Sequence, residues 1–441
     1  MTAVSEAPEQ QTGSQDGADR GAARGALFAV WSAKAVASLG RTVSIVALPW
    51  FVLQITGSGT QTGLAVASSG LGIAVVGFFS GALIDRSGAK RSSIASLVVA
   101  GAAVDLVPLL FMLDLLALWQ LLALVFVASA LDSVAGVAVE TLVPGAARAA
   151  RVSLESANAV LAAIDRFALL IMPVVAGIAL ALLGAEIVLW VDTAACLIAA
   201  TLLALKVPAT ARAAATVAKG VRGYADAVRD GIRVLWRDRV LVSLTVTGTG
   251  LNTLISSLYS IVLLAYAAEV FGSALHFAGM IAAVGGGALA GALLFAAVGR
   301  RLPRRTWLLI ACFGTAGTVL PLATIPGQVA TVVLMAASGM LLAPIGPLVA
   351  VAFQERTPAA SLGRVLSARN ALMLAGVPLG GLVAGISLDV VGLAGTIGVI
   401  GSLTLTIALA VTVLPVFRGL DERPDPGQPV PGDRQLEGVD S

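Results

Sequence analysis

The amino-acid sequence predicts an all-α membrane protein with twelve transmembrane helices arranged as two six-helix bundles. The chain has 441 residues, of which 58% are hydrophobic and only 12% are charged. Soluble domains average roughly 25% charged residues, so most of this chain has no water to face. Apolar runs of about 18 or more residues recur along the whole length, and each is long enough to cross the hydrocarbon core of a bilayer.

The apolar runs are expected to be helices. Only helices and closed barrels satisfy the backbone in lipid, and barrel strands alternate between apolar and polar residues, which these runs do not. In the first half we expect helices over residues 26–53, 62–84, 92–113, 117–139, 157–183 and 187–206. In the second half we expect them over 241–268, 276–298, 306–325, 329–352, 365–388 and 394–416.

Lys and Arg residues gather in alternate loops, which indicates the topology. Arg86 and Lys90 follow the second predicted helix, Arg148 and Arg151 follow the fourth, and the loops on the opposite side carry no Lys or Arg. Because cytoplasmic loops are enriched in these residues, we expect a multi-pass protein of the plasma membrane with both termini in the cytoplasm. The same distribution accounts for the net charge of +3 without a nucleic-acid partner.

The segments outside the two bundles are polar. Residues 1–24 are expected to form a disordered cytoplasmic tail, since they lack the apolar core of a signal peptide. The bundles are expected over 25–206 and 241–417, and a second disordered tail over 418–441. The linker, 207–240, contains an amphipathic pattern from Val221 to Trp236 that is typical of a helix on the cytoplasmic leaflet; a soluble linker helix is the alternative.

The two halves look like diverged repeats. The second and eighth helices share a Gly-Ala-Leu-aliphatic sequence, at Gly81 and at Gly291, and the fourth and tenth helices both end in an acid followed by a proline, Glu140 with Pro144 and Glu355 with Pro358. Internal duplication of a six-helix unit is typical of transporters whose substrate site lies between two bundles near the membrane midplane.

The loop after the second helix carries the most specific motif. It reads Gly81-Ala82-Leu83-Ile84-Asp85-Arg86-Ser87-Gly88-Ala89-Lys90-Arg91. Its glycines, the Asp-Arg pair and the two final basic residues resemble the signature loop of the major facilitator superfamily. The resemblance extends from about Trp31 to Val416, and it implies that Asp85 and Arg86 take part in a latch between the bundles at the cytoplasmic gate. Alternatively, Arg86, Lys90 and Arg91 only set the topology. Phe295 stands where the second half would have the acid, so any such latch is one-sided.

Shorter stretches resemble the drug and macrolide efflux group of this superfamily, which includes siderophore exporters. These are Ser38-Leu39-Gly40, Ala47-Leu48-Pro49 and Gln54-Ile55-Thr56-Gly57-Ser58 around the first helix. The resemblance implies a secondary active transporter, with proton-coupled efflux of an amphipathic small molecule such as an antibiotic or other secondary metabolite.

Ionisable side chains inside the predicted helices mark the candidate coupling site, because burying them in lipid is costly. Lys34, Asp132 and Asp165 lie roughly 10–12 Å from the cytoplasmic helix ends at about 1.5 Å of rise per residue. We expect them to form one cluster with Arg166. Asp132 is the first candidate for the group that carries the coupled proton, and Asp165 is the second. A structural ion-pair network without titration is the alternative.

The substrate cavity is expected to be lined by Arg41 in the first bundle and by Asn252, Ser256 and Tyr259 in the second. A base at Arg41 suggests a substrate with an anionic or hydrogen-accepting group. Equally, Arg41 could neutralise a nearby aspartate, and the other three residues could serve helix packing. Asp105 and Asp192 are expected to be structural.

The residue inventory argues against an enzyme. There is one histidine and there are two cysteines, with no metal-ligand spacing, nucleophile motif or phosphate loop. We therefore expect no cofactor, no metal and an ion gradient as the energy source, in a protein that acts as a monomer. An uptake permease and a lysolipid flippase are alternatives with the same fold, and a membrane sensor or scaffold that transports nothing is the alternative from another class.

Overall fold

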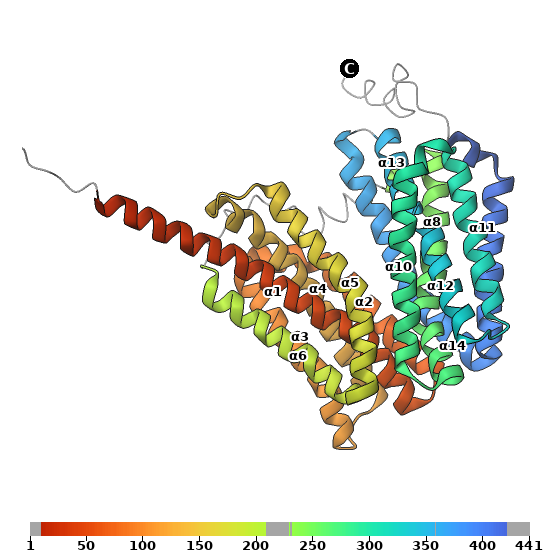
Figure 1. Ribbon diagram of the computed structural model, residues 1–441, viewed down its shortest axis with the longest axis horizontal. Coiled ribbons are helices and arrows are strands. Elements are labelled where there is room, and N and C mark those ends of the chain that lie inside the picture. The colour runs from red at the N-terminus through yellow and green to blue at the C-terminus, as the bar shows by residue number, and fades with distance from the viewer. Residues whose placement is uncertain (1–9, 209–228, 230–231, 358, 421–441) are drawn as a thin grey trace, which may run out of the picture.

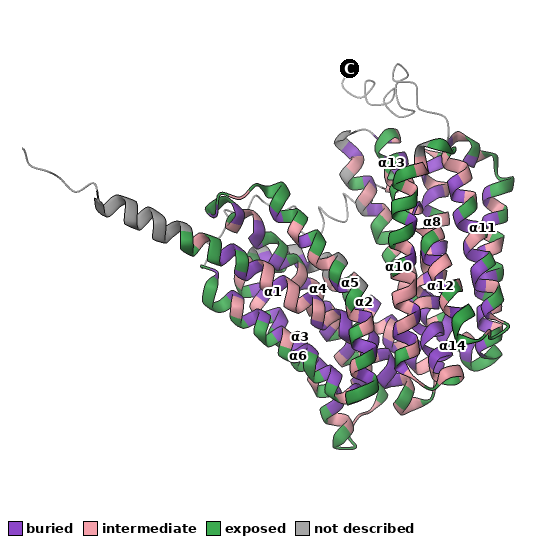
Figure 2. Cartoon of the chain, in the orientation of Figure 1, coloured by how far each residue is buried: buried purple, intermediate pink, exposed green. Residues whose placement is uncertain are grey.

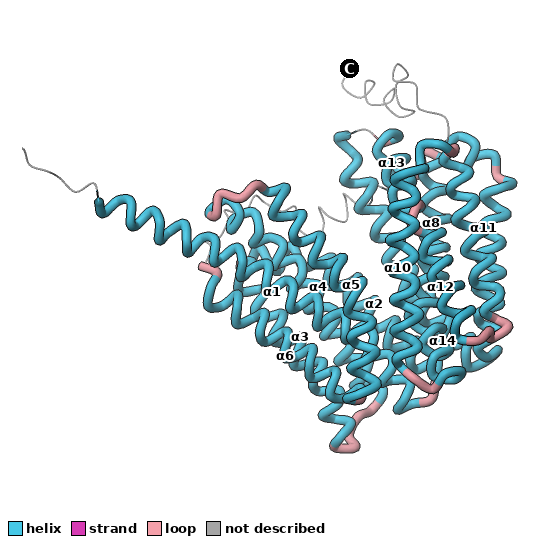
Figure 3. The backbone as a smooth tube through the Cα atoms, viewed as in Figure 1, coloured by secondary structure: helices cyan, strands magenta, loops and turns pink. Residues whose placement is uncertain are grey.

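The computed structural model of the chain consists of two helical bundles (Figure 1). The structure describes residues 10–208, 229, 232–357 and 359–420, and this part of the chain contains helices and no strands. The side chains of Asp85 and Arg166 lie outside the described part, as does the burial of Gly81. Where the structure describes the connections between helices, these are mostly short loops at the ends of the bundles (Figure 3).

The first bundle contains six long helices, which correspond to the six predicted in the first half of the chain. These are α1 (Gln10–Thr56), α2 (Gly59–Ser87), α3 (Ala89–Met112), α4 (Leu118–Ala149), α5 (Leu154–Leu183) and α6 (Ala185–Lys206).

The second bundle contains several helices that are interrupted. Its elements are α8 (Arg239–Ser257), the π-helical segment η1 (Leu258–Val262), α9 (Leu263–Tyr266), the π-helical segment η2 (Ala267–Phe271), α10 (Ala274–Val298), the 3-10 segment η3 (Gly299–Arg301), α11 (Arg304–Leu322), α12 (Gln328–Leu342), α13 (Ile345–Arg356), α14 (Ala359–Val413) and the 3-10 segment η4 (Pro415–Leu420).

Twelve crossings follow from these helices. Ten segments of the described chain are long and apolar enough to span a membrane, with α8 to η2 forming one and α12 with α13 another. The longest of the ten lies in α14, which Gly392 (φ +72°) divides into two helices. Dividing it and adding the 30-residue α5 gives twelve.

The structure differs from the prediction at the N-terminus. Helix α1 begins at Gln10, so residues 10–24, expected in a disordered tail, continue the first helix. Eight of the fifteen residues 10–24 are Ala, Gln or Arg, which favour helix and outnumber the three glycines of this segment. No proline lies between Pro8 and Pro49. Polarity excludes this segment from the lipid but does not prevent it from being helical. Most of the expected amphipathic helix from Val221 to Trp236 lies outside the described residues.

The two bundles meet at one end and diverge toward the end where the C-terminus lies (Figure 1). One contact joins the start of α2 to the middle of α14, where a side chain on Gly385 would come within 2.5 Å of the Gly59 carbonyl oxygen. The other joins the end of α5 to the start of α10, where Gly177 faces Ala278. We call this the closed end of the molecule, and the other the open end.

Burial follows the same division. One apolar core extends across both bundles at the closed end and includes Phe51 of α1 and Tyr266 of α9. At the open end each bundle has a core of its own, around Leu203 in the first and Phe353 in the second. Apolar side chains such as Leu182 are exposed on the outer surface (Figure 2), as expected for helices in contact with lipid.

Candidate functional site

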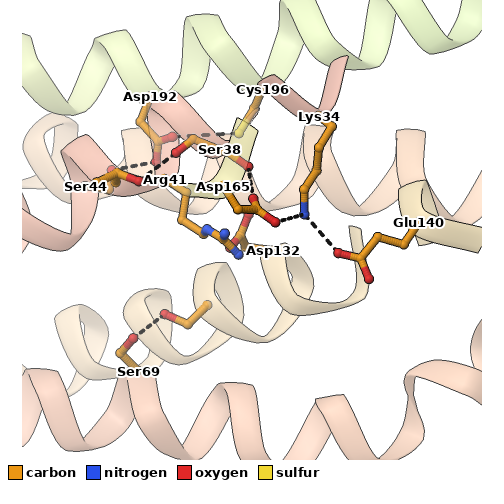
Figure 4. Close-up of polar contacts among 12 residues, drawn as sticks. Lys34, Ser38, Arg41, Ser44, Ser69, Asp132, Glu140, Asp165, Asp192 and Cys196 are labelled. Atoms are coloured by element: carbon orange, nitrogen blue, oxygen red, sulfur yellow. Dashed lines mark hydrogen bonds and ion pairs between the residues drawn. The ribbon is translucent and has the colours of Figure 1, made fainter. Parts of the chain in front are cut away.

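Helix α1 presents a row of polar side chains to the interior of the first bundle. Lys34, Ser38, Arg41 and Ser44 recur every three or four residues, which aligns them on one face of a helix. Each of the four contacts a carboxylate from another helix (Figure 4). The face of α1 therefore determines how the buried acids of the bundle are paired.

The first group is centred on Lys34. Its ammonium lies 3.0 Å from Glu140 Oε1 of α4 and 3.3 Å from Asp165 Oδ2 of α5. Ser38 donates a hydrogen bond of 3.0 Å to Asp165 Oδ1. The lysine is buried, whereas both carboxylates are partly exposed. One buried cation is thus shared between two partly exposed acids.

The second group is the ion pair of Arg41 and Asp132, whose Nη1 and Oδ2 atoms are 3.6 Å apart. This pairing agrees with one of the two alternatives for Arg41, that it neutralises a nearby aspartate. Within the expected cluster, Asp132 pairs with Arg41 while Lys34 pairs with Asp165, and Lys34, Arg41 and Asp132 line the same small cavity. The side chain of Arg166 is not described.

Glu140 is a member of the site that the sequence analysis used only as a marker of the internal repeat. It ends the apolar part of α4, two helical turns after Asp132, and thus lies on a similar face. This spacing could have predicted Glu140, since two acids that lie two turns apart on one helix face a similar direction. Glu140 was not among the predicted cluster residues because it lies nearer the membrane surface than they do.

Asp192 of α6, expected to be structural, lines a cavity in the first bundle. Its Oδ2 accepts a hydrogen bond of 2.5 Å from Ser44, and Cys196 Sγ lies 4.0 Å from its Oδ1. Helix α1 approaches closely here because Gly40 has no side chain: a Cβ atom on it would come within 2.6 Å of Asp192 Oδ1. The glycine of the Ser-Leu-Gly stretch therefore allows Asp192 to reach the hydroxyl on α1.

A cavity of about 150 Å³ penetrates the first bundle beside these groups. Its polar lining comes from Arg41, Ser44, Asp132 and Asp192, from the hydrogen-bonded pair of Ser69 and Ser129, and from Ser260 of the second bundle. The rest is mainly small and aliphatic residues of α1 to α4. A second cavity of about 20 Å³ is lined by Lys34, Ser38, Arg41 and Asp132 among others. The Arg41 and Asp132 pair thus borders both cavities. An apolar chamber with a few convergent polar groups is typical of a small-molecule site.

Two of the three residues predicted for the wall on the second bundle have partners on other helices. Asn252 donates to the Met373 carbonyl, Ser256 to the Thr253 carbonyl, and the Tyr259 hydroxyl lies 2.9 Å from Ser338 Oγ. The contacts of Asn252 and Tyr259 tie helices together, which agrees with the alternative of helix packing, while the Ser256 contact lies within α8. Ser260, which was not predicted, lines the cavity.

The helix type changes just before Tyr259 and Ser260. Helix α8 becomes π-helical at Leu258. Because a π-helical turn contains an extra residue, it rotates every later side chain away from its expected face.

The signature loop is a tight turn between α2 and α3. Gly88 has φ +84°, a backbone conformation that favours glycine. Lys90 donates to the Ala204 and Val207 carbonyls at the end of α6, at 2.9 and 2.5 Å. This cation caps a helix C-terminus within its own bundle. Arg86 and Arg91 are exposed.

The described residues include no group of three or more His, Cys, Asp or Glu side chains that could hold a metal ion. Cys196 and Cys312 are both buried and unbridged. The side chains of the described site can therefore form ion pairs, hydrogen bonds and apolar contacts.

Comparisons with known proteins agree with this architecture. The sequence profile described as Major Facilitator Superfamily matches residues 30–373 and 246–439. The Multidrug efflux pump Tap of Mycobacterium tuberculosis is 29% identical over 409 residues, which cover 92% of this chain and 97% of that protein. Tap of Mycolicibacterium fortuitum is 28% identical over 402 residues, covering 90% and 98%.

Two solved structures have the same fold. The nucleoside transporter NupG superposes with a TM-score of 0.71 at 12% identity, covering 89% of this chain and 99% of that one. A bacterial homolog to the human lysosomal transporter Spinster, in an inward-facing and unoccupied conformation, superposes with a TM-score of 0.65 at 15% identity, covering 92% and 99%.

Proposed function

The chain belongs to the Major Facilitator Superfamily, and on this premise we propose that it is a proton-coupled exporter of amphipathic small molecules. The two bundles would expose the cavity to each side of the membrane in turn. The cavity beside Arg41 and Asp132 carries the proposal, because it joins an apolar chamber to an ion pair that a proton could break. The similarity to proteins named multidrug efflux pumps supports export of drug-like compounds.

Sidedness is part of the proposal. Arg86 and Arg148 lie in the last turns of α2 and α4, and Arg304 begins α11. These helix ends are at the open end, where the bundles diverge. Because Lys and Arg favour the cytoplasmic side, we take the open end as cytoplasmic, which also leaves both termini there. Substrate would then enter from the cytoplasm or the inner leaflet.

Asp132 is the proposed coupling residue. It pairs with Arg41 and borders both cavities, so its protonation would release Arg41 toward either cavity. Asp165 fits this role less well, because it shares Lys34 with Glu140 and also accepts from Ser38. Protonating Asp165 would therefore leave Lys34 with an acidic partner.

Reconstitution into liposomes tests both parts of this proposal. A panel of amphipathic compounds would be offered under an imposed pH gradient to the wild type, to Asp132→Asn and to Asp105→Asn. Asp105 is a matched control, since it is an acid on α3 that does not border the described cavities. We expect gradient-driven flux in the wild type and the control and its loss in Asp132→Asn. Unchanged flux in Asp132→Asn would remove Asp132 from the mechanism.

The direction of flux separates export from uptake. In inverted membrane vesicles, an exporter accumulates its substrate inside the vesicle when the lumen is acidic. Accumulation in right-side-out vesicles with the opposite gradient would identify an uptake permease instead.

A further inference from the structure

The carboxylate of Asp389 joins the two bundles at the closed end. Asp389 belongs to α14 in the second bundle, and its partners begin α2 in the first. Its Oδ1 accepts the Gly59 backbone N–H at 2.8 Å, and its Oδ2 accepts the Thr60 N–H and the Ser58 hydroxyl, each at 2.9 Å. The Ser58 hydroxyl oxygen also accepts the Gln61 N–H at 3.3 Å.

This arrangement caps a helix of one bundle with an acid of the other. The first N–H groups of a helix have no partner within the helix, and they carry partial positive charge that favours an anion. Ser58 is the local cap of α2. Asp389 satisfies two further N–H groups, so part of the capping free energy of α2 depends on the bundles staying together.

The capping contact lies at the end of a contact between α2 and α14 that is lined largely by glycines, which we call the seam. Along α2, Gly59 faces Gly385, Gly63 faces Gly381, and Gly70 faces Pro378. Residue numbers rise on one helix as they fall on the other, so α2 and this part of α14 are antiparallel. The backbones touch, and a small separation of the helices would break all three hydrogen bonds to Asp389 together.

We propose that Asp389 is a positioning residue that holds the closed end shut and releases α2 when that end opens during transport. This inference rests on the alternating access proposed above. The antiparallel geometry adds a second feature, since Asp85 lies in the last turns of α2, at the end of the seam near the start of α14. Each helix of the seam thus carries an acid near its C-terminal end, level with the N-terminal end of its partner. The two ends would be held shut in opposite states of the cycle.

Labelling of a cysteine in the seam reports the opening directly. Val66 lies against Gly381, so Val66→Cys would be introduced after replacing the two native cysteines by alanine (Cys196→Ala, Cys312→Ala). A membrane-impermeant maleimide is added on the side opposite the termini, without substrate or gradient. We expect Asp389→Ala to raise the labelling rate roughly 3- to 30-fold, the factor that corresponds to the loss of a helix cap.

The controls separate the latch from general loosening and from the proposed function. Asp389→Asn keeps an acceptor oxygen and should lie between Asp389→Ala and the wild type, while Glu269→Ala removes an exposed acid that is not on the seam and should match the wild type. Should Asp389→Ala accumulate poorly, Gly385→Val places a side chain against the Gly59 carbonyl and should open the same seam. Equal or slower labelling in these Asp389 and Gly385 variants would overturn the inference. The labelling assay measures no transport, so a negative labelling result would not contradict the export proposal. Failure of the export assay would likewise not contradict the role proposed for Asp389.

Discussion

The shared ion pair of Lys34 predicts an asymmetry between two perturbations of the same site. The lysine side chain is only 6% exposed, whereas Glu140 is 53% and Asp165 is 41% exposed. Removing both acids, in Glu140→Gln with Asp165→Asn, leaves a buried ammonium group without an anionic partner, which costs about 3–5 kcal/mol. Removing the cation, in Lys34→Met, leaves two carboxylates that water reaches, and Asp165 keeps Ser38 as a donor. Partly exposed pairs contribute about 0–1 kcal/mol, so we expect a cost near the top of that range.

Thermal unfolding of the detergent-solubilised protein measures this asymmetry. For domains of 150–250 residues, 1 kcal/mol shifts Tm by about 2–4 °C. The double acid variant should therefore unfold roughly 6–20 °C below the wild type, and Lys34→Met less than about 4 °C below it. A triple variant that lacks the lysine and both acids should recover most of the loss. If Lys34→Met is the less stable of the two, the acids are the buried members and the reasoning is wrong.

Three other regions give independent predictions. Gly177→Val should abolish transport while the protein still accumulates in the membrane, because the added side chain collides with Ala278; Ala278→Gly in the same chain should restore part of the flux. Glu355→Gln breaks a surface pair with Arg304, with N to O distances of 2.5 and 2.8 Å, and should change the free energy of unfolding by less than about 1 kcal/mol. The buried thiol of Cys312 should react with maleimide only on unfolding, so rapid reaction in the folded protein would contradict the packing of the second bundle.

The class of the protein and the identity of its buried charges could be predicted from the sequence. Hydrocarbon offers the backbone no hydrogen-bond partners, so an apolar run of sufficient length has to become a helix. Each ionisable residue inside such a run has to face the interior. Four such residues were predicted in the first bundle, Lys34, Arg41, Asp132 and Asp165. All four contact partners within that bundle.

The pairing of those charges could not be predicted from the sequence. Depth along a helix follows from residue number, but the partner of a side chain depends on how its helix is rotated and tilted against its neighbours. Lys34 therefore pairs with Glu140 and Asp165 and not with Asp132. Local irregularity has the same effect, since the π-helical turn at Leu258 changes the faces on which Tyr259 and Ser260 lie, and Ser260 lines the cavity.

The sequence alone thus determined that the chain crosses the membrane about twelve times as two related bundles, because lipid permits few alternatives for such a composition. Only the tertiary structure decided which end is closed and which contacts close it. Those contacts depend on glycines that let backbones touch and on Asp389 reaching the start of α2, 329 to 331 residues away in the sequence. Contacts between residues so far apart leave no periodic pattern in the sequence, because the packing of the two bundles creates them.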